Sequence, residues 1–439
     1  MHKIDNEITH KIILVLLITV TIMIQNPLEP MFKGILGKFQ IFDIIFPISI
    51  LFIFKNIYKN LFNRFNLSIL FLVILFITSS VITSKFNIKH IIFLYLFSIL
   101  LLVSSIRLSE IEIKKILDLF FNFILIMLLF CLFCFIYSLL SGQSTIFTQV
   151  REGFPYLNHV VRIIGPFKPT AKFLSFYLLC LWPVLVIWYT KFNSNKKYFI
   201  LISCLCMIVS LLTFGRSGLF SAFIYFTTII YFFNKNEKIY KLILIYISFL
   251  LTFLLILTNS TIHLGINFSE CTPEAISKNS TQYFGWIYNN SSKCFSFDIS
   301  LYENTYIILK KIALNMWYTQ PIFGNGMGSF YYEYLRLSEN NLLSTNLKPL
   351  DFFYPQSQYF LLLSENGLFG FCIWFSILFF CFYKILNFSK MFKSNLGIIY
   401  ILCFSSTLID LDIQNFRFFY FLVGFILLII HSEEVKKEN

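Results

Sequence analysis

Charged residues are scarce in this chain and make up 13% of its 439 residues. Soluble domains carry about 25% charged and about 45–50% apolar residues, whereas 57% of this chain is hydrophobic and its mean hydropathy is +0.75. An ordinary soluble protein is therefore excluded. The chain also contains no cluster of histidine and cysteine with the spacing of metal ligands. We therefore expect no structural zinc, no other metal and no cofactor.

Long apolar stretches are abundant. A membrane-spanning helix needs about 20 apolar residues, or fewer when lysine and aromatic side chains reach the interface. Twelve stretches meet this requirement: 11–26, 40–54, 67–83, 88–106, 116–140, 170–190, 197–214, 218–233, 241–258, 367–386, 395–411 and 416–431. The first ends in Gln25 and Asn26 and is followed by Pro27 rather than by a cleavage site of small residues, so we expect it to remain as an anchor.

The spans are distributed unevenly along the chain. Nine fall in residues 1–258 and three in residues 355–431, and a polar, aromatic-rich segment, 259–354, separates the two groups. This layout predicts an all-α integral membrane protein with about 12 transmembrane helices and one large loop domain on a single side of the bilayer. A shorter outer loop, 141–169, precedes the sixth span, and a tail, 432–439, follows the last.

Positive charges beside the spans predict the orientation. If the N-terminus lies in the cytoplasm, each of five short inner connections carries three Lys or Arg, whereas the short outer connections near 33–38 and 85–89 carry two each. Because such charges favour the cytoplasmic side, we expect both termini in the cytoplasm of a bacterial inner membrane and the large loop in the periplasm. The net charge of +13 reflects this signal and contact with the lipid bilayer, and it gives no reason to invoke nucleic acid.

The large outer loop contains two of the ten cysteines, Cys271 and Cys294, and the other eight lie in spans. In an oxidising compartment such a pair closes a loop and stabilises a small domain by about 3 kcal/mol. A Cys271–Cys294 disulfide is predicted, with two free thiols as the alternative. Residues 259–300 are rich in Asn, Ser and Thr without periodicity and are expected to form an ordered loop.

Helical periodicity returns at 301–317, where apolar side chains recur every three or four residues. The pattern predicts an amphipathic helix on the membrane surface, although packing against the spans gives the same pattern. Three alternate glycines follow, Gly324, Gly326 and Gly328, and they allow the backbone to approach a ligand closely. As a nucleotide-binding loop this signal is weak, because the chain has no Walker lysine there.

Side chains suited to stacking on sugars and to hydrogen bonding with them follow the glycines. They include Tyr332, Gln356 and Gln358. A tyrosine-rich belt at the membrane interface is an equally good interpretation.

Arginine is much rarer than lysine, with seven copies against 28. Arg64 and Arg107 lie in inner connections. The other five lie on the outer side: Arg151, Arg162, Arg216, Arg336 and Arg417. Lysine serves nearly all inner connections, so the outer positions are expected to need the planar fork that a guanidinium offers to phosphate oxygens. This distribution predicts a phosphate or diphosphate ligand on the outer side, with attraction to lipid headgroups as the alternative.

Three of the outer arginines lie in distinctive turns. Arg216 lies in the turn sequence TFGRSG between consecutive spans, where backbone N–H groups at the start of the next helix favour an anion. Arg417 lies in the turn between the last two spans, and Asp412 is a candidate to neutralise it. Arg162 opens the sequence RIIGPFKP, whose glycine and prolines bend the chain and bring Arg162 and Lys168 to the start of the sixth span.

Four segments together resemble the O-antigen polymerase and O-antigen ligase superfamily. They are WYTQPIFGNGMGSF at Trp317–Phe330, YPQSQYFLLLSENGLFG at Tyr354–Gly370, the TFGRSG turn at 213–218, and Arg-x-x-Gly-x-Phe-x-Pro at 162–169. The resemblance implies a GT-C-like polytopic membrane glycosyltransferase that uses undecaprenyl-diphosphate-linked glycans. It also implies a site facing the periplasm, where arginines hold the lipid diphosphate, and no essential metal.

One departure separates the two branches of this superfamily. Ligases carry a His-Asn pair where this chain has Gln356 and Ser357. The resemblance therefore favours a polymerase that joins lipid-linked repeat units into O-antigen or a related surface polysaccharide, with a chain-length regulator protein as a partner. Two alternatives stay open: an O-antigen ligase that transfers glycan to the lipid A core, and a flippase of lipid-linked oligosaccharide.

The residues and the resemblance together suggest roles in such a reaction. Arg162, Arg216 and Arg417 are expected to stabilise charge on the departing diphosphate. Glu333 and Glu365 are candidates for the general base, and Glu365 could instead cap a helix. The expected substrate-binding residues are Lys168, Gly324, Gly326, Gly328, Tyr332, Arg336, Gln356 and Gln358.

Overall fold

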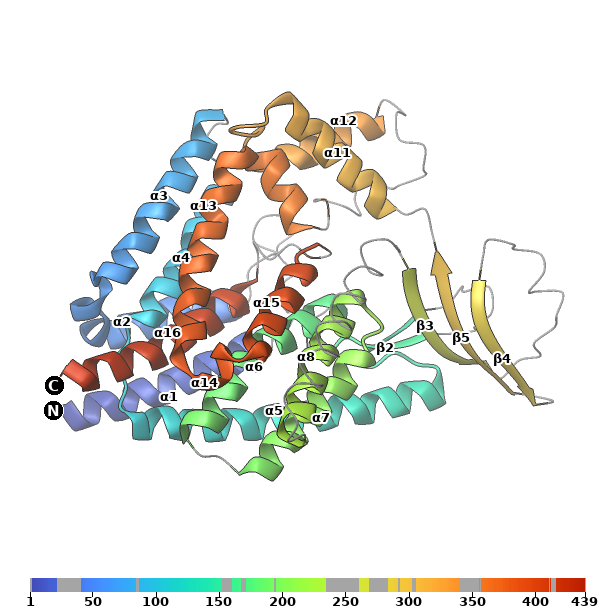
Figure 1. The fold of residues 1–439 in the computed structure, drawn as a ribbon, viewed down its shortest axis with the longest axis horizontal. Helices are drawn as coiled ribbons and strands as arrows, with labels where there is room; N and C mark the ends of the chain where they lie inside the picture. Colours follow the sequence, from blue (N-terminus) through green and yellow to red (C-terminus); the bar gives the residue numbers. More distant parts are fainter. Residues whose placement is uncertain are drawn as a thin grey trace.

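A computed structural model describes residues 2–21, 41–83, 87–151, 160–166, 171–192, 195–233, 260–267, 283–290, 293–301, 305–339, 355, 357–409, 411 and 416–438. Helices dominate the fold (Figure 1). Those before the large outer loop are α1 (His2–Thr21), α2 (Ile41–Leu61), α3 (Arg64–Thr83), α4 (Ile88–Ser104), α5 (Glu110–Ser141), α6 (Ala171–Phe192), α7 (Lys196–Leu211) and α8 (Arg216–Phe233). The later ones are α11 (Thr305–Thr319), α12 (Ser329–Glu339), α13 (Gln358–Phe388), α14 (Lys390–Lys393), α15 (Asn395–Thr407) and α16 (Arg417–Glu438).

Apolar helices coincide with the predicted spans that fall in the described residues. Four are long and apolar enough to cross a membrane: Arg64–Thr83, Glu110–Ser141, Lys172–Phe192 and Gln358–Phe388. Shorter apolar helices cover further predicted spans, and the ninth, 241–258, lies outside the described residues. The apolar helical bundle is as predicted, whereas the number of twelve spans stays a prediction.

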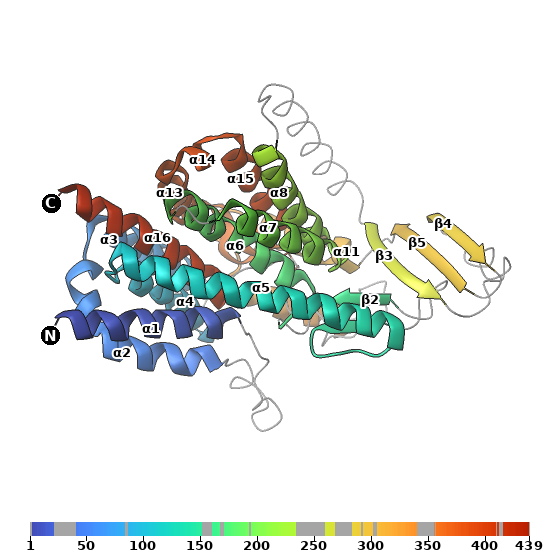
Figure 2. The same ribbon diagram turned by 90° about the horizontal axis from the view of Figure 1, so that it is seen from below.

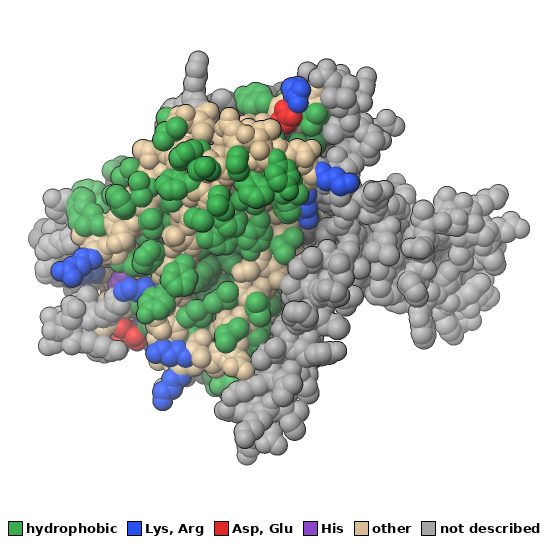
Figure 3. All heavy atoms as spheres, turned by 45° about the horizontal axis from the view of Figure 1, so that its top comes forward, with side chains coloured by type: hydrophobic (Ala, Val, Ile, Leu, Met, Phe, Trp, Pro, Cys, Tyr) green, Lys and Arg blue, Asp and Glu red, His purple; other side chains and the backbone are tan. Residues whose placement is uncertain are grey.

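The surface of the bundle is apolar between two charged edges. Figure 3 shows a wide field of hydrophobic side chains with lysines and arginines at its borders. Large exposed apolar side chains of the bundle include Phe52 of α2, Phe71 of α3 and Phe133 of α5, which are 75%, 61% and 65% exposed. Because exposed apolar area of this extent is unfavourable in water, lipid is the solvent that suits this face.

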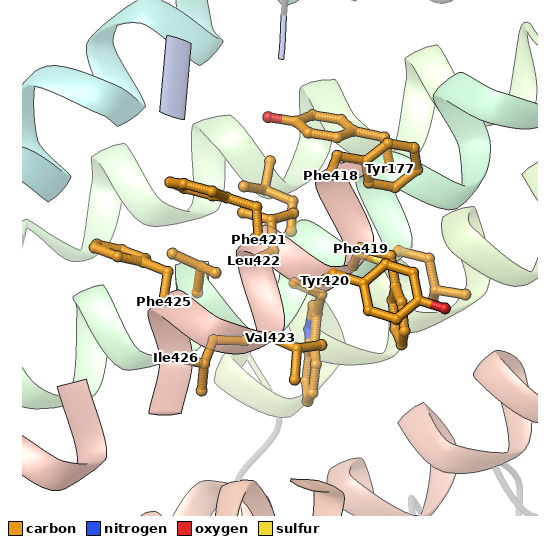
Figure 4. Packing of buried hydrophobic residues seen from close by; sticks show 14 of the residues in the cluster. Tyr177, Phe418, Phe419, Tyr420, Phe421, Leu422, Val423, Phe425 and Ile426 are labelled. Carbon is orange, nitrogen blue, oxygen red and sulfur yellow. The ribbon is translucent and has the colours of Figure 1, made fainter. Parts of the chain in front are cut away.

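Two helices, α6 and α16, form the centre of the bundle. A helix that is apolar on every side is stable only when it is surrounded, and in α16 the residues from Phe418 to Ile430 are buried. Figure 4 shows Phe418, Tyr420 and Phe421 pointing away from α16 in different directions, with Tyr177 of α6 beside Phe418. α16 packs against α4, α6 and α13, and both chain ends lie at the same end of the molecule (Figures 1 and 2).

Residues 141–169 and 259–354 contain β-structure, so the prediction that 259–300 forms an ordered loop without periodicity is wrong. Strands β3 (Ser260–Asn267), β4 (Tyr283–Asn290) and β5 (Lys293–Leu301) form an antiparallel sheet in the order β3-β5-β4. The reason is a period of two in β5, where apolar residues alternate with serine and aspartate. A hairpin of β1 (Thr148–Arg151) and β2 (Val160–Ile163) lies in the shorter loop. The sheet projects from the bundle (Figure 2).

The predicted amphipathic helix exists as α11, although it begins at Thr305 rather than near residue 301. Its apolar face is buried within the protein: Leu309, Ala313 and Met316 form a cluster with side chains of α12 and with Leu361 of α13. Packing against neighbouring helices therefore explains the periodicity of the apolar residues. This was the alternative to a helix on the membrane surface.

Candidate functional site

Helix α13 is broken at Gly367, and we call this break, together with the loop bonded to it, the elbow. Gly367 adopts φ 63° and ψ −170° inside an otherwise helical run. A break in a helix leaves backbone carbonyls and N–H groups without hydrogen-bond partners. Backbone atoms of the loop 321–326 are their partners here. Asn325 N and Gly326 N donate to Ser364 O and Glu365 O at 3.0 and 2.7 Å. Below the break, Leu368 N and Phe369 N donate to Pro321 O and Ile322 O at 2.9 and 3.0 Å.

The elbow joins two of the four sequence segments on which the predicted resemblance rests. Trp317–Phe330 supplies the loop and Tyr354–Gly370 supplies the broken helix. Of the predicted substrate-binding glycines, Gly324 and Gly326 lie within this loop, and Gly328 lies against the side chains of Lys89 and Asn87. The glycines thus allow the backbone of the loop to lie close to the backbone of α13 at the elbow.

Gly324 is the glycine whose replacement we expect to be most damaging. It adopts φ +71°, and a Cβ there would collide with backbone atoms of Gly367, Asn366 and Glu365. A Gly324→Ala variant should lose at least about 1–3 kcal/mol of folding free energy from the left-handed backbone alone. Thermal unfolding in detergent measures the loss. Gly215→Ala is the matched control, because its nearest neighbour, Ser217 Oγ, lies at 3.7 Å. Equal melting temperatures for the two variants would contradict this account.

Glu365 places a buried carboxylate at the elbow. Its side chain has no solvent exposure, and its Oε1 lies 3.4 Å from Lys89 Nζ and 3.4 Å from Phe330 N. The lysine side chain is 40% exposed and reaches the carboxylate from the surface. The second oxygen, Oε2, makes no hydrogen bond to any residue that the structure describes. A buried carboxylate oxygen without a donor is costly, so this atom is available to a ligand hydroxyl.

The first turn of α4 holds the elbow in place. Asn87 caps α4 by accepting from Lys89 N at 3.0 Å, and its Nδ2 donates to Met327 O at 2.7 Å. His90 Nε2 lies 3.2 Å from Ser80 Oγ, and Met327 N donates to the same hydroxyl at 3.3 Å. The glycine loop is therefore bonded to α3 and α4 as well as to α13.

A second feature, which we call the arginine end, is formed where α6, α8 and α16 begin. Ile163 N of β2 donates to Leu212 O at 3.1 Å, which joins the Arg162 strand to the TFGRSG turn. Ser175 of α6 and Thr213 of that turn share a hydrogen bond of 2.8 Å between their hydroxyls. The rings of Phe173 and Phe416 lie 4.6 Å apart, so α16 begins beside α6. Three helix N-termini with their partial positive charges thus gather here.

The TFGRSG turn carries backbone strain. Phe214 adopts φ 48°, the only positive φ of a non-glycine residue in the described chain, and such backbone is often found at binding sites. In the next turn, Ser217 Oγ is buried without a hydrogen-bond partner among the described residues. α8 begins at Arg216, whose side-chain direction lies outside the description. Arg162 stands opposite Gln149 in the hairpin and is half-buried.

Arg417 is paired with an acid that the sequence analysis did not single out. Its Nε donates to Asp43 Oδ1 of α2 at 2.6 Å, and Tyr95 of α4 donates to the same oxygen at 2.9 Å. The Asp43 and Arg417 side chains are 1% and 13% exposed. Asp412, the partner suggested by the sequence, lies outside the described residues.

The elbow and the arginine end are connected through α4. Helices α4 and α16 run in the same direction. Near the start of α16, Tyr95 of α4 donates to Asp43, the partner of Arg417, and further along both helices Ser104 O lies 3.3 Å from His431 Nδ1. Lys89 lies six residues before Tyr95, which is about 9 Å along a helix. Both features therefore lie near one end of the bundle, away from the chain termini.

Glu333, the other candidate base, lies on the surface. Its carboxylate forms two hydrogen bonds with Arg336 of the same helix, at 2.7 and 2.8 Å, and the Arg336 side chain is 61% exposed. These hydrogen bonds lower the pKa of Glu333, which makes it a weaker base. Tyr332 is 71% exposed beside it.

The remaining predicted residues fall at several places. Gln358 is buried at the start of α13, where its backbone N–H bonds Leu408 O and Leu411 O at 2.9 and 3.0 Å. Lys168 and Gln356 lie outside the described residues, as does Cys271. Only the backbone of Cys294 is described, in β5, so the disulfide stays a prediction. In the described part of the chain, no group of three or more His, Cys, Asp or Glu side chains is placed to hold a metal ion.

Several residues at these two features escaped the sequence analysis, although signals for them exist. Asp43 is the one acidic residue in the predicted span 40–54, and acids inside spans are usually functional. Asn87 and His90 have the spacing of a capping box. In the sequence analysis, Lys89 entered only as one of the two positive charges in the connection near 85–89.

Comparisons with known proteins add no relative. A scan against models of protein families finds no match, and a search of curated proteins finds no similar chain.

Proposed function

We propose that this chain is a metal-independent membrane glycosyltransferase that polymerises undecaprenyl-diphosphate-linked repeat units at the periplasmic face of a bacterial inner membrane. The observation that carries the proposal is the elbow. Two strings that resemble the O-antigen polymerase and ligase superfamily, separated in sequence by an intervening segment, form one hydrogen-bonded unit around the Glu365 carboxylate. The arginine end lies nearby and offers a place for the donor diphosphate.

The donor diphosphate would lie at the arginine end. Three helix N-termini favour an anion there, Arg162 would add a cationic fork, and α8 begins at Arg216. As the bond between the anomeric carbon and the diphosphate oxygen breaks, its electron pair moves to the diphosphate. Donors fixed before the reaction stabilise that developing charge more than they stabilise the ground state. Arg417 keeps its Nε on Asp43, so its role is to hold the start of α16.

The acceptor hydroxyl would be activated at the elbow. Glu365 Oε2 accepts no hydrogen bond from the described residues, while Lys89 and the Phe330 N–H hold Oε1. The acceptor oxygen forms the new bond to the anomeric carbon, and its proton passes to Glu365. Because Glu365 has no solvent exposure, the acceptor must displace neighbouring groups to reach it, and the same burial keeps bulk water from the carboxylate.

Deletion of the gene, with the lipid-linked products examined, tests the proposal. Loss of a polymerase should leave single repeat units on the acceptor lipid, and complementation by the intact gene should restore long chains. Long chains that persist on undecaprenyl diphosphate without transfer would instead identify an O-antigen ligase.

A flippase is the second candidate, and the broken helix α13 is the observation that favours it. Discontinuous helices often form the substrate sites of transporters. The two are distinguishable with purified protein in liposomes: a polymerase lengthens glycans when donor and acceptor are on the same face, whereas a flippase moves them across the bilayer without a change in length.

A further inference from the structure

Lys89 of α4 connects the buried carboxylate of the elbow with the surface of the protein. Its Nζ lies 3.4 Å from Glu365 Oε1, and its side chain is 40% exposed, whereas that of Glu365 has no exposure. Among the basic side chains that the structure describes, Lys89 is the one that forms an ion pair with this carboxylate. An ion pair that is partly open to solvent contributes little to folding, so stability is a weak reason for the contact.

The local structure determines where this lysine can reach. Asn87, the N-cap of α4, accepts from Lys89 N at 3.0 Å and donates to Met327 O of the glycine loop at 2.7 Å. The lysine stem lies beside Gly328, because a Cβ placed on that glycine would come within 3.4 and 3.5 Å of Lys89 Cδ and Cε. Gly328 has φ +90°, a conformation that glycine adopts readily. The cap and the glycine together lead the ammonium to Glu365.

The two oxygens of the Glu365 carboxylate have unequal contacts. Lys89 Nζ and Phe330 N each lie 3.4 Å from Oε1, and Oε2 accepts no hydrogen bond from the described residues. The last torsion of a glutamate side chain is broad, so a carboxylate without contacts could turn either oxygen toward a ligand. Two contacts on Oε1 restrict this rotation and fix the direction of Oε2.

We propose that Lys89 is a positioning residue for the general base. Its ammonium holds Oε1 of Glu365 and thereby keeps Oε2 directed at the acceptor hydroxyl. The acceptor proton passes to Oε2, and the Lys89 ammonium keeps its own three protons. This inference rests on the proposed function, in which Glu365 is the base. A base held in one orientation reacts faster than one that samples several, because orientation is part of the barrier.

The test compares initial rates of chain extension by the purified full-length protein with lipid-linked repeat units. Lys89→Met keeps an unbranched apolar stem beside Gly328 and loses the ammonium. We expect kcat to fall about 10–100-fold, the effect of one hydrogen bond to a charged group, with a smaller change in KM. Lys89→Arg restores a cation and should recover part of kcat. Lys311→Met, at an exposed lysine of α11, is the matched control and should leave the rate unchanged.

The Glu365→Gln background separates positioning from folding. If Lys89 acts through the Glu365 carboxylate, Lys89→Met should slow chain extension no further in a protein that already carries Glu365→Gln. A lysine that only supports the fold would lower the rate by the same factor in both backgrounds, and that result overturns the proposal. If Lys89→Met fails to fold, Lys89→Gln takes its place in both comparisons.

The same measurements distinguish a failure of this inference from a failure of the proposed function. An unchanged protein that extends no glycan refutes the proposed function, and the role of Lys89 falls with it. Extension by the unchanged protein that persists at full rate in Lys89→Met refutes the role of Lys89 alone.

Discussion

A Glu365→Gln variant is expected to extend glycan chains about 10²–10⁴ times more slowly than the unchanged protein, because a positioned proton acceptor contributes a factor of that size. Glutamine matches glutamate in size, and its amide oxygen can still accept from Phe330 N, so the elbow should persist. The measurement is the initial rate of chain extension by purified protein with lipid-linked repeat units. Thermal unfolding of both proteins separates lost chemistry from lost folding.

Glu333→Gln carries the opposite expectation. The Glu333 carboxylate is committed to Arg336 on the surface of α12, and ion pairs this exposed contribute little. Its replacement should leave the rate of chain extension unchanged. Should Glu333→Gln stop extension while Glu365→Gln does not, the assignment of the base to the elbow is wrong.

Arg216→Ala should slow chain extension by about 10²–10³, the usual effect of removing one group that stabilises transition-state charge. Arg216→Lys keeps the charge but loses the planar fork, so it should recover only part of the rate. Arg107→Ala is the matched control, since Arg107 is exposed in the connection between α4 and α5. Full activity of both Arg216 variants at equal expression would eliminate the diphosphate role.

Hydropathy predicted the bundle well for a physical reason. Each helix must satisfy its own backbone in lipid, so apolar length alone identifies it, and α3, α5 and α6 lie where the apolar stretches placed them. The β3-β5-β4 sheet was missed because a composition rich in Asn and Ser hid the alternation in β5. Composition averages over residues, whereas the strand depends on their order.

The elbow was only partly predictable. Its glycines and Glu365 were identified as candidates, but the pairing of loop 321–326 with the break in α13 uses backbone hydrogen bonds, which leave no side-chain pattern in the sequence. The Arg417 partner was missed because Asp43 lies in a distant helix. Contacts between residues 374 positions apart follow from the packing of whole helices rather than from local sequence.

The break at Gly367 also makes residues 358–366 of α13 a short, separate helical segment. One end is bonded to the connection between α15 and α16 through Gln358 N, and the other end is bonded to the loop 321–326. The rise from Gln358 to Glu365 is about 10 Å. Because the segment between the two ends is continuous helix, we expect any displacement of the connection that leads to Arg417 to be transmitted to the Glu365 carboxylate. Under the proposed function, departure of one lipid and alignment of the next would therefore be mechanically coupled.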